Sequence, residues 1–336
     1  MFPDMFKRIV AASLTLMTFV SVLNAREKDL RFNENGQFKI AQFTDMHLYL
    51  GHSDYRDAQA EKTFARLSRV VRNEKPDLLV FTGDIVTGGD GMRAWNRLLD
   101  SLNQYKLPFC VMFGNHDPEV VSRLDMSKVI VSSPYSLNIL NAAKELVDME
   151  LTVKASKGNK VSCVLYCMDS HDYPRDKSLG KYAWFETSQV EWLRNCCMAQ
   201  RKANGGEPVN SLAFFHICLQ EYGSAFDNPK NYKKGRRAES ECPGALNPGM
   251  FAAMVETGNI MGVFVGHDHD NDYVVLEKGI ALGYGRFSGD YTTYTTFRSG
   301  VRIIVLEEGK RGFETWILED EGRKAVKFKM EDNKFL

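Results

Sequence analysis

Residues 77–84, which read Asp-Leu-Leu-Val-Phe-Thr-Gly-Asp, show a pattern that indicates the fold class. An apolar run of strand length stops at a polar cluster, which is typical of a buried strand that ends in a loop. We predict five further buried strands that end in a polar cluster, at residues 38–44, 109–113, 161–168, 211–215 and 261–265. Buried strands with polar ends therefore recur along most of the chain.

Helical periodicity separates these predicted strands. Phe64, Leu67 and Val71 share one helical face before Pro76, and further helices are predicted at residues 94–102, 187–199 and 250–256. After residue 271 the chain becomes β-rich, with predicted strands at residues 273–276, 280–284, 301–306 and 313–318. Strands that alternate with helices, followed by a β-rich end, favour an α/β (α+β) fold in which two sheets pack together.

The first 25 residues differ in kind from the rest of the chain. Lys7 and Arg8 precede an apolar run at residues 9–22, and the small residue Ala25 stands before a charged stretch. This order is typical of a secretory signal peptide, so we expect residues 1–25 to be removed and the protein to be exported, as a periplasmic or secreted protein. A membrane anchor formed by residues 9–22 is the alternative. No Pro/Ser-rich linker follows, so residues 26–336 are predicted to form a single domain.

The charges of the chain balance, with 43 Lys and Arg against 43 Asp and Glu. We therefore expect no nucleic-acid partner and, unless the N-terminal segment is uncleaved, no stable membrane partner. A basic cluster within residues 230–237 is interpreted as a solvated loop, with a substrate-steering rim as the alternative. Seven cysteines are an odd number, so at least one lacks a partner within the chain, while Cys218 and Cys242 could pair in an oxidising compartment.

Five of the seven histidines stand where predicted strands end. They occur in the clusters Asp45-Met46-His47, Gly114-Asn115-His116-Asp117, Phe215-His216 and Gly266-His267-Asp268-His269, and a fifth cluster is Gly83-Asp84. Loops that leave the carboxyl ends of strands in α/β sheets converge, so these side chains are expected to share one site. Imidazole nitrogens combined with carboxylate and amide oxygens suit zinc, iron, manganese or nickel. The clusters therefore predict a metal site.

The spacing within the clusters supports shared ligation. Residues i and i+2 of an extended segment point to the same side, so Asp45 and His47 can hold one ion together. The same holds for His267 and His269, although their loop could also send them to different ions. Asp84 is the natural bridging carboxylate of a two-metal site, since no other ligand flanks it. A small residue before each ligand is expected to let the backbone turn sharply, at Gly83, Gly114 and Gly266.

Taken in order, the five clusters resemble the motifs of the calcineurin-like metallophosphoesterases. The resemblance covers roughly residues 38–272 and implies a four-layer αββα sandwich of two mixed β-sheets, with a binuclear centre at the carboxyl ends of its strands. It also implies two divalent ions, which could be manganese, iron, zinc or nickel. One ion would be held by Asp45, His47, Asp84 and His269, and the other by Asp84, Asn115, His216 and His267.

Further phrases, such as Gly283-Tyr284-Gly285-Arg286, resemble a smaller branch that is related to the purple acid phosphatases. Those phosphatases carry a tyrosine three residues after the bridging aspartate, where this chain has Thr87, so no purple ferric centre is expected. The resemblance also implies that His116 faces the scissile phosphate rather than a metal, and that Asp117 orients its ring.

The resemblance implies hydrolysis of a phosphate monoester through a metal-bound hydroxide at the binuclear centre, with a phosphorylated small molecule as the substrate. A phosphodiesterase that acts on a cyclic nucleotide or a phospholipid head group is the alternative on the same centre. A non-catalytic metal-binding module is the alternative from a different class of protein.

Several other residues have two interpretations each. Arg286 could clamp a substrate phosphate or form a surface ion pair. Tyr182 and Trp184 could line a substrate pocket or lie in the core. Asp268 and Asp270 could orient ligand imidazoles or lie in a solvated loop. The two remaining histidines, His52 and His171, are interpreted as ordinary polar residues.

Overall fold

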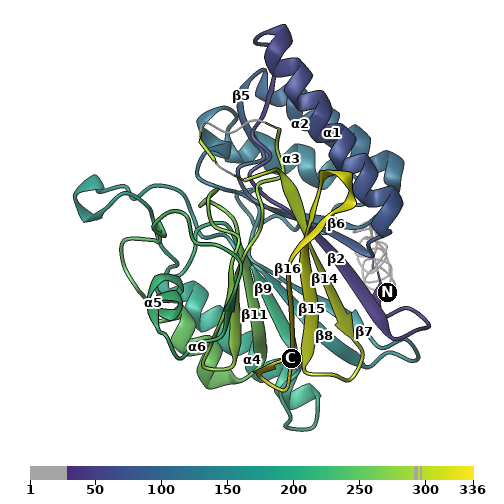
Figure 1. Cartoon of the computed structure of the whole chain (residues 1–336), viewed down its shortest axis with the longest axis vertical. Coiled ribbons are helices and arrows are strands. Elements are labelled where there is room, and N and C mark those ends of the chain that lie inside the picture. The colour runs from purple at the N-terminus through teal and green to yellow at the C-terminus, as the bar shows by residue number, and fades with distance from the viewer. Residues whose placement is uncertain (1–28, 291–293, 296) are drawn as a thin grey trace, which may run out of the picture.

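The computed structural model describes residues 29–290, 294–295 and 297–336 (Figure 1). The predicted signal peptide at residues 1–25, and with it the alternative anchor at residues 9–22, lies outside the described residues. Within the described part of the chain, no helix is long and apolar enough to cross a membrane. These residues fold into two large sheets, one two-stranded sheet and six α-helices.

One large sheet has the strand order β17-β16-β15-β14-β2-β4-β6. Its parallel strands are β2 (Gln37–Phe43), β4 (Leu78–Thr82) and β6 (Phe109–Met112). The helices α1 (Asp54–Glu74) and α2 (Gly91–Tyr105) lie on the connections between them. Antiparallel strands complete the sheet: β14 (Gly300–Glu307), β15 (Gly312–Glu319), β16 (Lys324–Glu331) and β17 (Lys334–Phe335).

The other large sheet has the order β1-β7-β8-β9-β11-β13-β12-β10. Its central strands are parallel: β8 (Val161–Cys167), β9 (Ser211–Phe214), β11 (Ile260–Val265) and β13 (Ile280–Tyr284). Its outer strands are β1 (Leu30–Arg31), β7 (Met149–Lys154), β12 (Val274–Glu277) and β10 (Lys233–Lys234). Three helices lie on its connections: α4 (Thr187–Ala203), α5 (Glu221–Asp227) and α6 (Met250–Thr257).

The remaining elements are short. β3 (Leu48–Leu50) pairs with β5 (Val86–Gly89) in the two-stranded sheet, and α3 (Arg123–Ser132) follows β6. The structure also has three single-turn 3₁₀ helices, Asp117–Glu119, Lys177–Leu179 and Asp320–Gly322.

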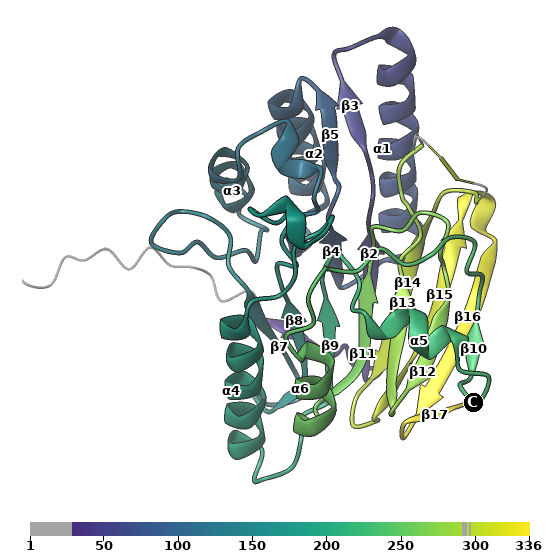
Figure 2. The same ribbon diagram turned by 90° about the vertical axis from the view of Figure 1, so that its left-hand side faces the viewer.

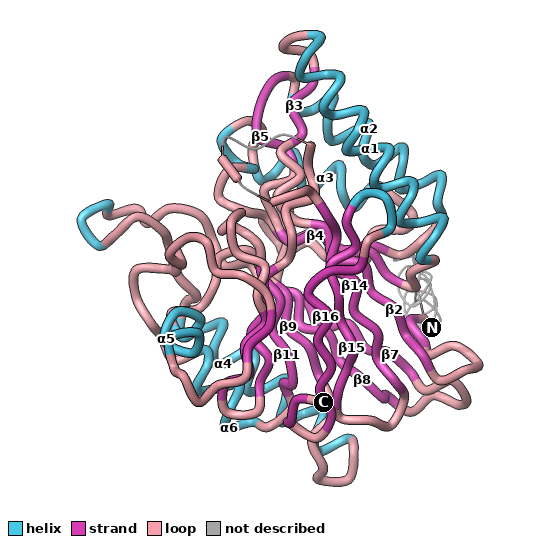
Figure 3. Tube along the Cα trace, viewed as in Figure 1, coloured by secondary structure: helices cyan, strands magenta, loops and turns pink. Residues whose placement is uncertain are grey.

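Three apolar cores separate four layers of secondary structure. On β2, Ala41 and Phe43 pack toward the helices α1 and α2, whereas Phe38 and Ile40 pack toward the second sheet. This alternation follows from the two-residue period of a strand. A third core lies between the second sheet and the helices α4–α6. Figures 2 and 3 show the two groups of helices, α1–α3 and α4–α6, with the strands between them, so the predicted αββα sandwich of two mixed sheets is confirmed.

The six predicted buried strands correspond to β2, β4, β6, β8, β9 and β11, and their bounds differ by at most one residue. The predicted helices correspond to α1, α2, α4 and α6. Helix α1 begins well before its apolar face because Ser53 caps it, with Oγ accepting a 3.3 Å hydrogen bond from the Arg56 amide. Strand β16 was not predicted, since alternating lysines interrupt its apolar residues near the sheet edge.

Candidate metal centre

The predicted ligands stand in five loops that leave the carboxyl ends of parallel strands. Asp45 and His47 follow β2, Asp84 follows β4, Asn115 follows β6, His216 follows β9, and His267 and His269 follow β11. Three of these strands belong to one large sheet and two to the other. The packing of the two sheets therefore brings the five loops together, as the clusters of polar strand ends predicted.

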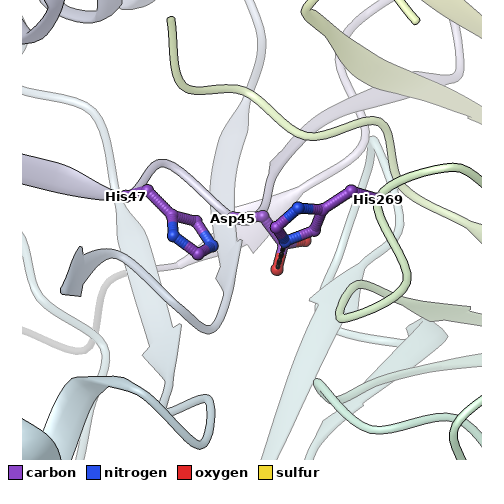
Figure 4. A group of neighbouring side chains, drawn as sticks. All are labelled: Asp45, His47 and His269. Carbon is purple, nitrogen blue, oxygen red and sulfur yellow. Dashed lines mark ion pairs between the residues drawn. The ribbon is translucent and has the colours of Figure 1, made fainter. Parts of the chain in front are cut away.

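Asp45, His47 and His269 form one group of candidate ligands, whose ligand atoms all lie within 4.8 Å of one another. The imidazole rings of His47 and His269 meet edge to face with their centroids 4.8 Å apart. His269 Nε2 lies 3.5 Å from Asp45 Oδ1. Figure 4 shows the three side chains converging on a common centre, with His269 reaching it from the loop after β11.

Asp84, His216 and His267 form a second group with the same spread of ligand atoms, within 4.8 Å of one another. Asp84 Oδ2 lies 3.3 Å from His216 Nε2 in its own group and 3.9 Å from His47 Nε2 in the first group. The other carboxylate oxygen, Oδ1, accepts a 2.8 Å hydrogen bond from the backbone amide of His116. Asp84 thus lies between the two groups, in the position that a bridging carboxylate would occupy.

The polar atoms of this region fit a pair of divalent cations. Nε2 of His47, His216 and His267 and Oδ1 of Asn115 are buried without hydrogen-bond partners among the described residues. Buried polar atoms are normally paired, because leaving one unpaired costs about 1–3 kcal/mol. Nδ1 of His216 lies 2.7 Å from the Thr82 carbonyl oxygen and donates to it, so Nε2 is the nitrogen that could bind a cation. Cations bound by these atoms would supply the missing partners.

Burial and charge set the protonation of the two groups. Burial and a neighbouring imidazole lower the pKa of His47 to about 4 and that of His267 to about 3. Burial by itself would raise the pKa of the Asp84 carboxyl, but the charge of His216 holds that pKa below its ordinary value. Burial would likewise lower the pKa of His216, but Asp84 raises it to about 10. Neutral imidazoles and ionised carboxylates bind metal, so a cation at Asp84 would replace the proton of His216.

Four candidate ligands have a backbone conformation that side chains other than glycine rarely adopt. The φ angles are 50° at Asp45, 45° at His47, 52° at Asp84 and 78° at His267. Such residues cost roughly 1–3 kcal/mol each and cluster at functional sites, where the surrounding structure holds them in place. Four of the seven candidate ligands thus lie in strained backbone, although residues away from the centre, such as Lys75 and Lys106, also have positive φ.

The glycines before the ligands serve two purposes, of which the sequence indicated one. Gly83, Gly114 and Gly266 all lie in the described part of the chain. Among these three glycines, only Gly83 has a positive φ angle, of 87°, as expected for a sharp turn. A Cβ at Gly114 would lie 2.2 Å from Asp84 Oδ1, and a Cβ at Gly266 would lie 1.9 Å from Thr44 Oγ1. Gly114 and Gly266 are therefore required for close approach between loops rather than for the turn that was predicted.

The expected role of Asp117 is wrong. Its fully buried carboxylate accepts hydrogen bonds of 2.8–3.0 Å from four backbone amides, those of Asp84, Ile85, Val86 and Gly114. Asp117 therefore holds the loop that carries Asp84. The ring of His116 is instead contacted by Glu119, whose Oε2 lies 2.8 Å from His116 Nδ1.

Both groups of candidate ligands open into a cleft of about 690 Å³, which His116 and Thr87 also line. Tyr182 lines the same cleft and packs edge to face on His267, with ring centroids 4.4 Å apart. Trp184 lies at a separate, smaller crevice. The other residues that line the cleft are Tyr49, Arg56, Glu119, Tyr173, Lys181, Glu239, Cys242, Asp268 and Tyr294.

Neither interpretation of Arg286 is correct. Its side chain is buried in ion pairs with Asp272 and with Glu319, the latter at 3.2 Å, and lines a different cavity from the candidate ligands. Asp268 is buried as well, and it accepts hydrogen bonds from the Tyr284 hydroxyl at 2.6 Å and the Cys242 amide at 3.2 Å. All seven cysteines lie in the described residues and are free thiols, so Cys218 and Cys242 do not pair in this structure.

Sequence reasoning missed Glu119 and Tyr173. The Tyr173 hydroxyl donates to Glu119 Oε1 at 2.8 Å and accepts from Asn115 Nδ2 at 3.0 Å. Glu119 could have been found, because an acidic residue three positions after a histidine on a helical turn can reach its ring. No local pattern marks Tyr173, which reaches the cleft from the loop after β8.

A family model described as calcineurin-like phosphoesterase matches residues 38–271, which include every candidate ligand. The chain therefore belongs to the calcineurin-like phosphoesterase family. A dimetal phosphatase from Danio rerio superposes with a TM-score of 0.57 at 12% identity, covering 88% of this chain and 98% of that one. This likeness to a solved structure concerns the fold.

Among curated proteins, the chain is 32% identical to probable inactive purple acid phosphatase 29 of Arabidopsis thaliana, over 87% of this chain and 82% of that protein. It is also 32% identical to probable inactive purple acid phosphatase 14 of the same plant, over 86% of this chain and 79% of that protein. Phosphatase DCR2 of Saccharomyces cerevisiae is 27% identical over 85% of this chain and 54% of that protein. The predicted relationship to purple acid phosphatases is thus confirmed.

Proposed function

We propose that this protein is an active metal-dependent phosphomonoesterase. The observation that carries the proposal is the set of buried, unpaired ligand atoms on His47, His216, His267 and Asn115 around the Asp84 carboxylate. Asp45, His47, Asp84 and His269 would hold one divalent ion, and Asp84, Asn115, His216 and His267 the other. Such a pair of ions polarises phosphate oxygens and lowers the pKa of a bound water.

The residues of the cleft support a phosphoester substrate. His116 has a side chain that is 41% exposed, and it lines the cleft beside the candidate ligands. From there, its ring would give a proton to the oxygen that leaves from phosphorus. Arg56 and Lys181 line the same cleft, and their positive charges favour the dianion of a phosphate monoester over the monoanion of a diester. The substrate that we propose is a phosphorylated small molecule.

The proposed site of action is outside the cytoplasm. The order of basic, apolar and small residues in segment 1–25 supports export and cleavage after Ala25. Cleavage there would leave all described residues, and so both sheets, in the mature domain at residues 26–336. Fractionation of the expressing cells, with sequencing of the mature N-terminus, tests this part of the proposal.

Activity is tested on residues 26–336 with a chromogenic phosphomonoester and the matching diester, after chelation and after addition of manganese, zinc, iron or nickel. We expect metal-dependent turnover, faster with the monoester and absent in Asp84→Asn. For an alkyl phosphate, whose leaving oxygen needs a proton, His116→Ala is expected to lower kcat by about 10²–10⁴-fold and to keep its metal. A faster diester would favour the phosphodiesterase, and two bound ions without turnover would favour a non-catalytic metal-binding module.

A further inference from the structure

The side chain of Glu119 joins residues of the cleft that lie far apart in the sequence. Its Oε2 lies 2.8 Å from His116 Nδ1, and its Oε1 accepts a 2.8 Å hydrogen bond from the Tyr173 hydroxyl. The same hydroxyl accepts a 3.0 Å hydrogen bond from Asn115 Nδ2. A continuous chain of hydrogen bonds therefore runs from the His116 ring through Glu119 and Tyr173 to Asn115.

This chain of hydrogen bonds determines which nitrogen of His116 always carries a proton. An ionised carboxylate only accepts hydrogen bonds, so His116 Nδ1 is the donor to Glu119. Nε2 is then the nitrogen that exchanges a proton with a bound substrate. A proton on Nε2 is therefore the one that a leaving oxygen would receive.

The other end of the chain sets the orientation of Asn115. Its side-chain amide nitrogen donates a hydrogen bond to the Tyr173 hydroxyl. The amide oxygen therefore turns the other way, and it is buried without a hydrogen-bond partner among the described residues, as a metal ligand would be. Tyr173 thus orients the candidate ligand Asn115, whereas Glu119 contacts the His116 ring directly.

We propose that Glu119 is the positioning residue for His116, holding its ring with the proton on Nδ1 and linking it through Tyr173 to Asn115. This inference rests on the proposed function, because it concerns the residue that would protonate the leaving oxygen. Asp117 cannot take the role, since its carboxylate is occupied by four backbone amides. Glu119 acts through His116, so its removal should affect proton transfer more than substrate binding.

The kinetic test compares an alkyl phosphate, whose leaving oxygen needs a proton, with nitrophenyl phosphate, whose leaving oxygen needs none. Glu119→Ala is expected to lower kcat for the alkyl ester by about 10–100-fold, by analogy with loss of the partner that orients a metal-ligating histidine. For the nitrophenyl ester, kcat should change by about threefold or less, with KM and bound metal as in the unmodified protein. Glu119→Gln keeps an acceptor oxygen for His116 and should recover part of the loss.

Glu191→Gln, on the exposed side of α4, is the matched control and should leave both rates unchanged. Tyr173→Phe keeps the aromatic ring but removes both of its hydrogen bonds, so its effect and that of Glu119→Ala should not add. Equal losses for the two esters, or loss of bound metal from Glu119→Ala, would overturn the proposal.

A second readout does not depend on turnover. Nuclear magnetic resonance of the protein with ¹⁵N-labelled histidine, at a pH where the His116 ring is neutral, reports the tautomer of that ring. The signal of His116 is assigned by its absence from His116→Ala. We expect the Nδ1–H tautomer in the unmodified protein and its loss in Glu119→Ala, and an unchanged tautomer would refute the positioning role. If neither ester is hydrolysed, the proposed function fails, while the tautomer still decides the role of Glu119.

Discussion

Gly114 and Gly266 lie so close to the candidate ligands that neither position has room for a side chain. A Cβ at Gly114 would meet the Asp84 carboxylate at 2.2 Å, and a Cβ at Gly266 would come within 2.7 Å of Asp45 Oδ2. Non-bonded heavy atoms do not approach so closely, so the carboxylates would have to move. At the scale of single residues, the geometry of the centre therefore requires the ligands and also glycine, which has no Cβ, at positions 114 and 266.

Gly114→Ala is expected to displace Asp84 and to reduce bound metal and turnover at least tenfold, with a loss of about 1–3 kcal/mol in the free energy of unfolding from overpacking. Metal analysis and denaturant unfolding would measure the two effects. Gly158→Ala is the control, because a Cβ there meets no described atom within 4 Å and adds only the strain of a φ of 77°. Normal metal content in Gly114→Ala would contradict the importance of close approach.

At the scale of elements, helix α1 forms a hydrogen bond with the loop that contacts the residue directly after β2. Arg66 of α1 donates to the carbonyl oxygen of Ser288 at 2.6 Å, and Ser288 Oγ accepts a 3.2 Å hydrogen bond from the Thr44 amide. Arg66 also forms two hydrogen bonds, of 2.9 and 2.7 Å, with the carboxylate of Asp320. Since Thr44 precedes Asp45, these contacts connect the helix layer to the first candidate ligand.

Asp320→Asn is expected to lower the free energy of unfolding at neutral pH by about 1 kcal/mol, a modest value because the carboxylate is partly exposed to solvent. Burial would raise the pKa of Asp320, but hydrogen bonds and charge from Arg66 and Arg69 hold that pKa below its ordinary value. The stabilisation is therefore fully present above about pH 4, the pKa of an unfolded aspartate, and is lost as the pH falls through the lower folded pKa. Chemical unfolding of both proteins from pH 7 down to pH 3 would measure this, and a difference that does not shrink in acid would contradict it.

At the scale of the whole molecule, the centre exists only where the two sheets are packed together. Asp45, His47, Asp84 and Asn115 come from loops of one sheet, and the other three candidate ligands come from loops of the other. The apolar core between the sheets, which includes Ile40 and Phe214, holds those loops in register. Because the unfolded chain lacks this arrangement, metal binding at this centre would be coupled to folding.

Adding metal to the chelated protein is therefore expected to raise its melting temperature. A free metal concentration a hundred times the dissociation constant adds about 2.7 kcal/mol to the stability, which corresponds to roughly 5–10 °C for a domain of this size. Differential scanning calorimetry with and without manganese or zinc would measure the rise. In Asp84→Asn, most of this rise in melting temperature should be absent. An equal rise in that variant would show that the ions stabilise the protein at another site.

The layered fold and the set of candidate ligands could both be predicted from the amino-acid sequence. The stretch at residues 77–84 predicts β4 and the carboxylate after it because an apolar run and the polar cluster that ends it are adjacent along the chain. The same local signal marks the end of β2 and the loops after β6, β9 and β11. Strand β16 was not predicted. A strand near the edge of a sheet does not need a continuous apolar run, which is the signal used for the other strands.

The contacts of each side chain near the ligands, in contrast, could be established only from the folded structure. Asp117 binds backbone amides of residues 84–86, Glu119 reaches Tyr173 from another loop, and Arg286 is buried between two carboxylates. Each partner lies between fourteen and fifty-four positions away in the chain. A hydrogen bond requires its atoms to come within about 3 Å, and only the packing of the two sheets and their loops determines which distant residues come that close.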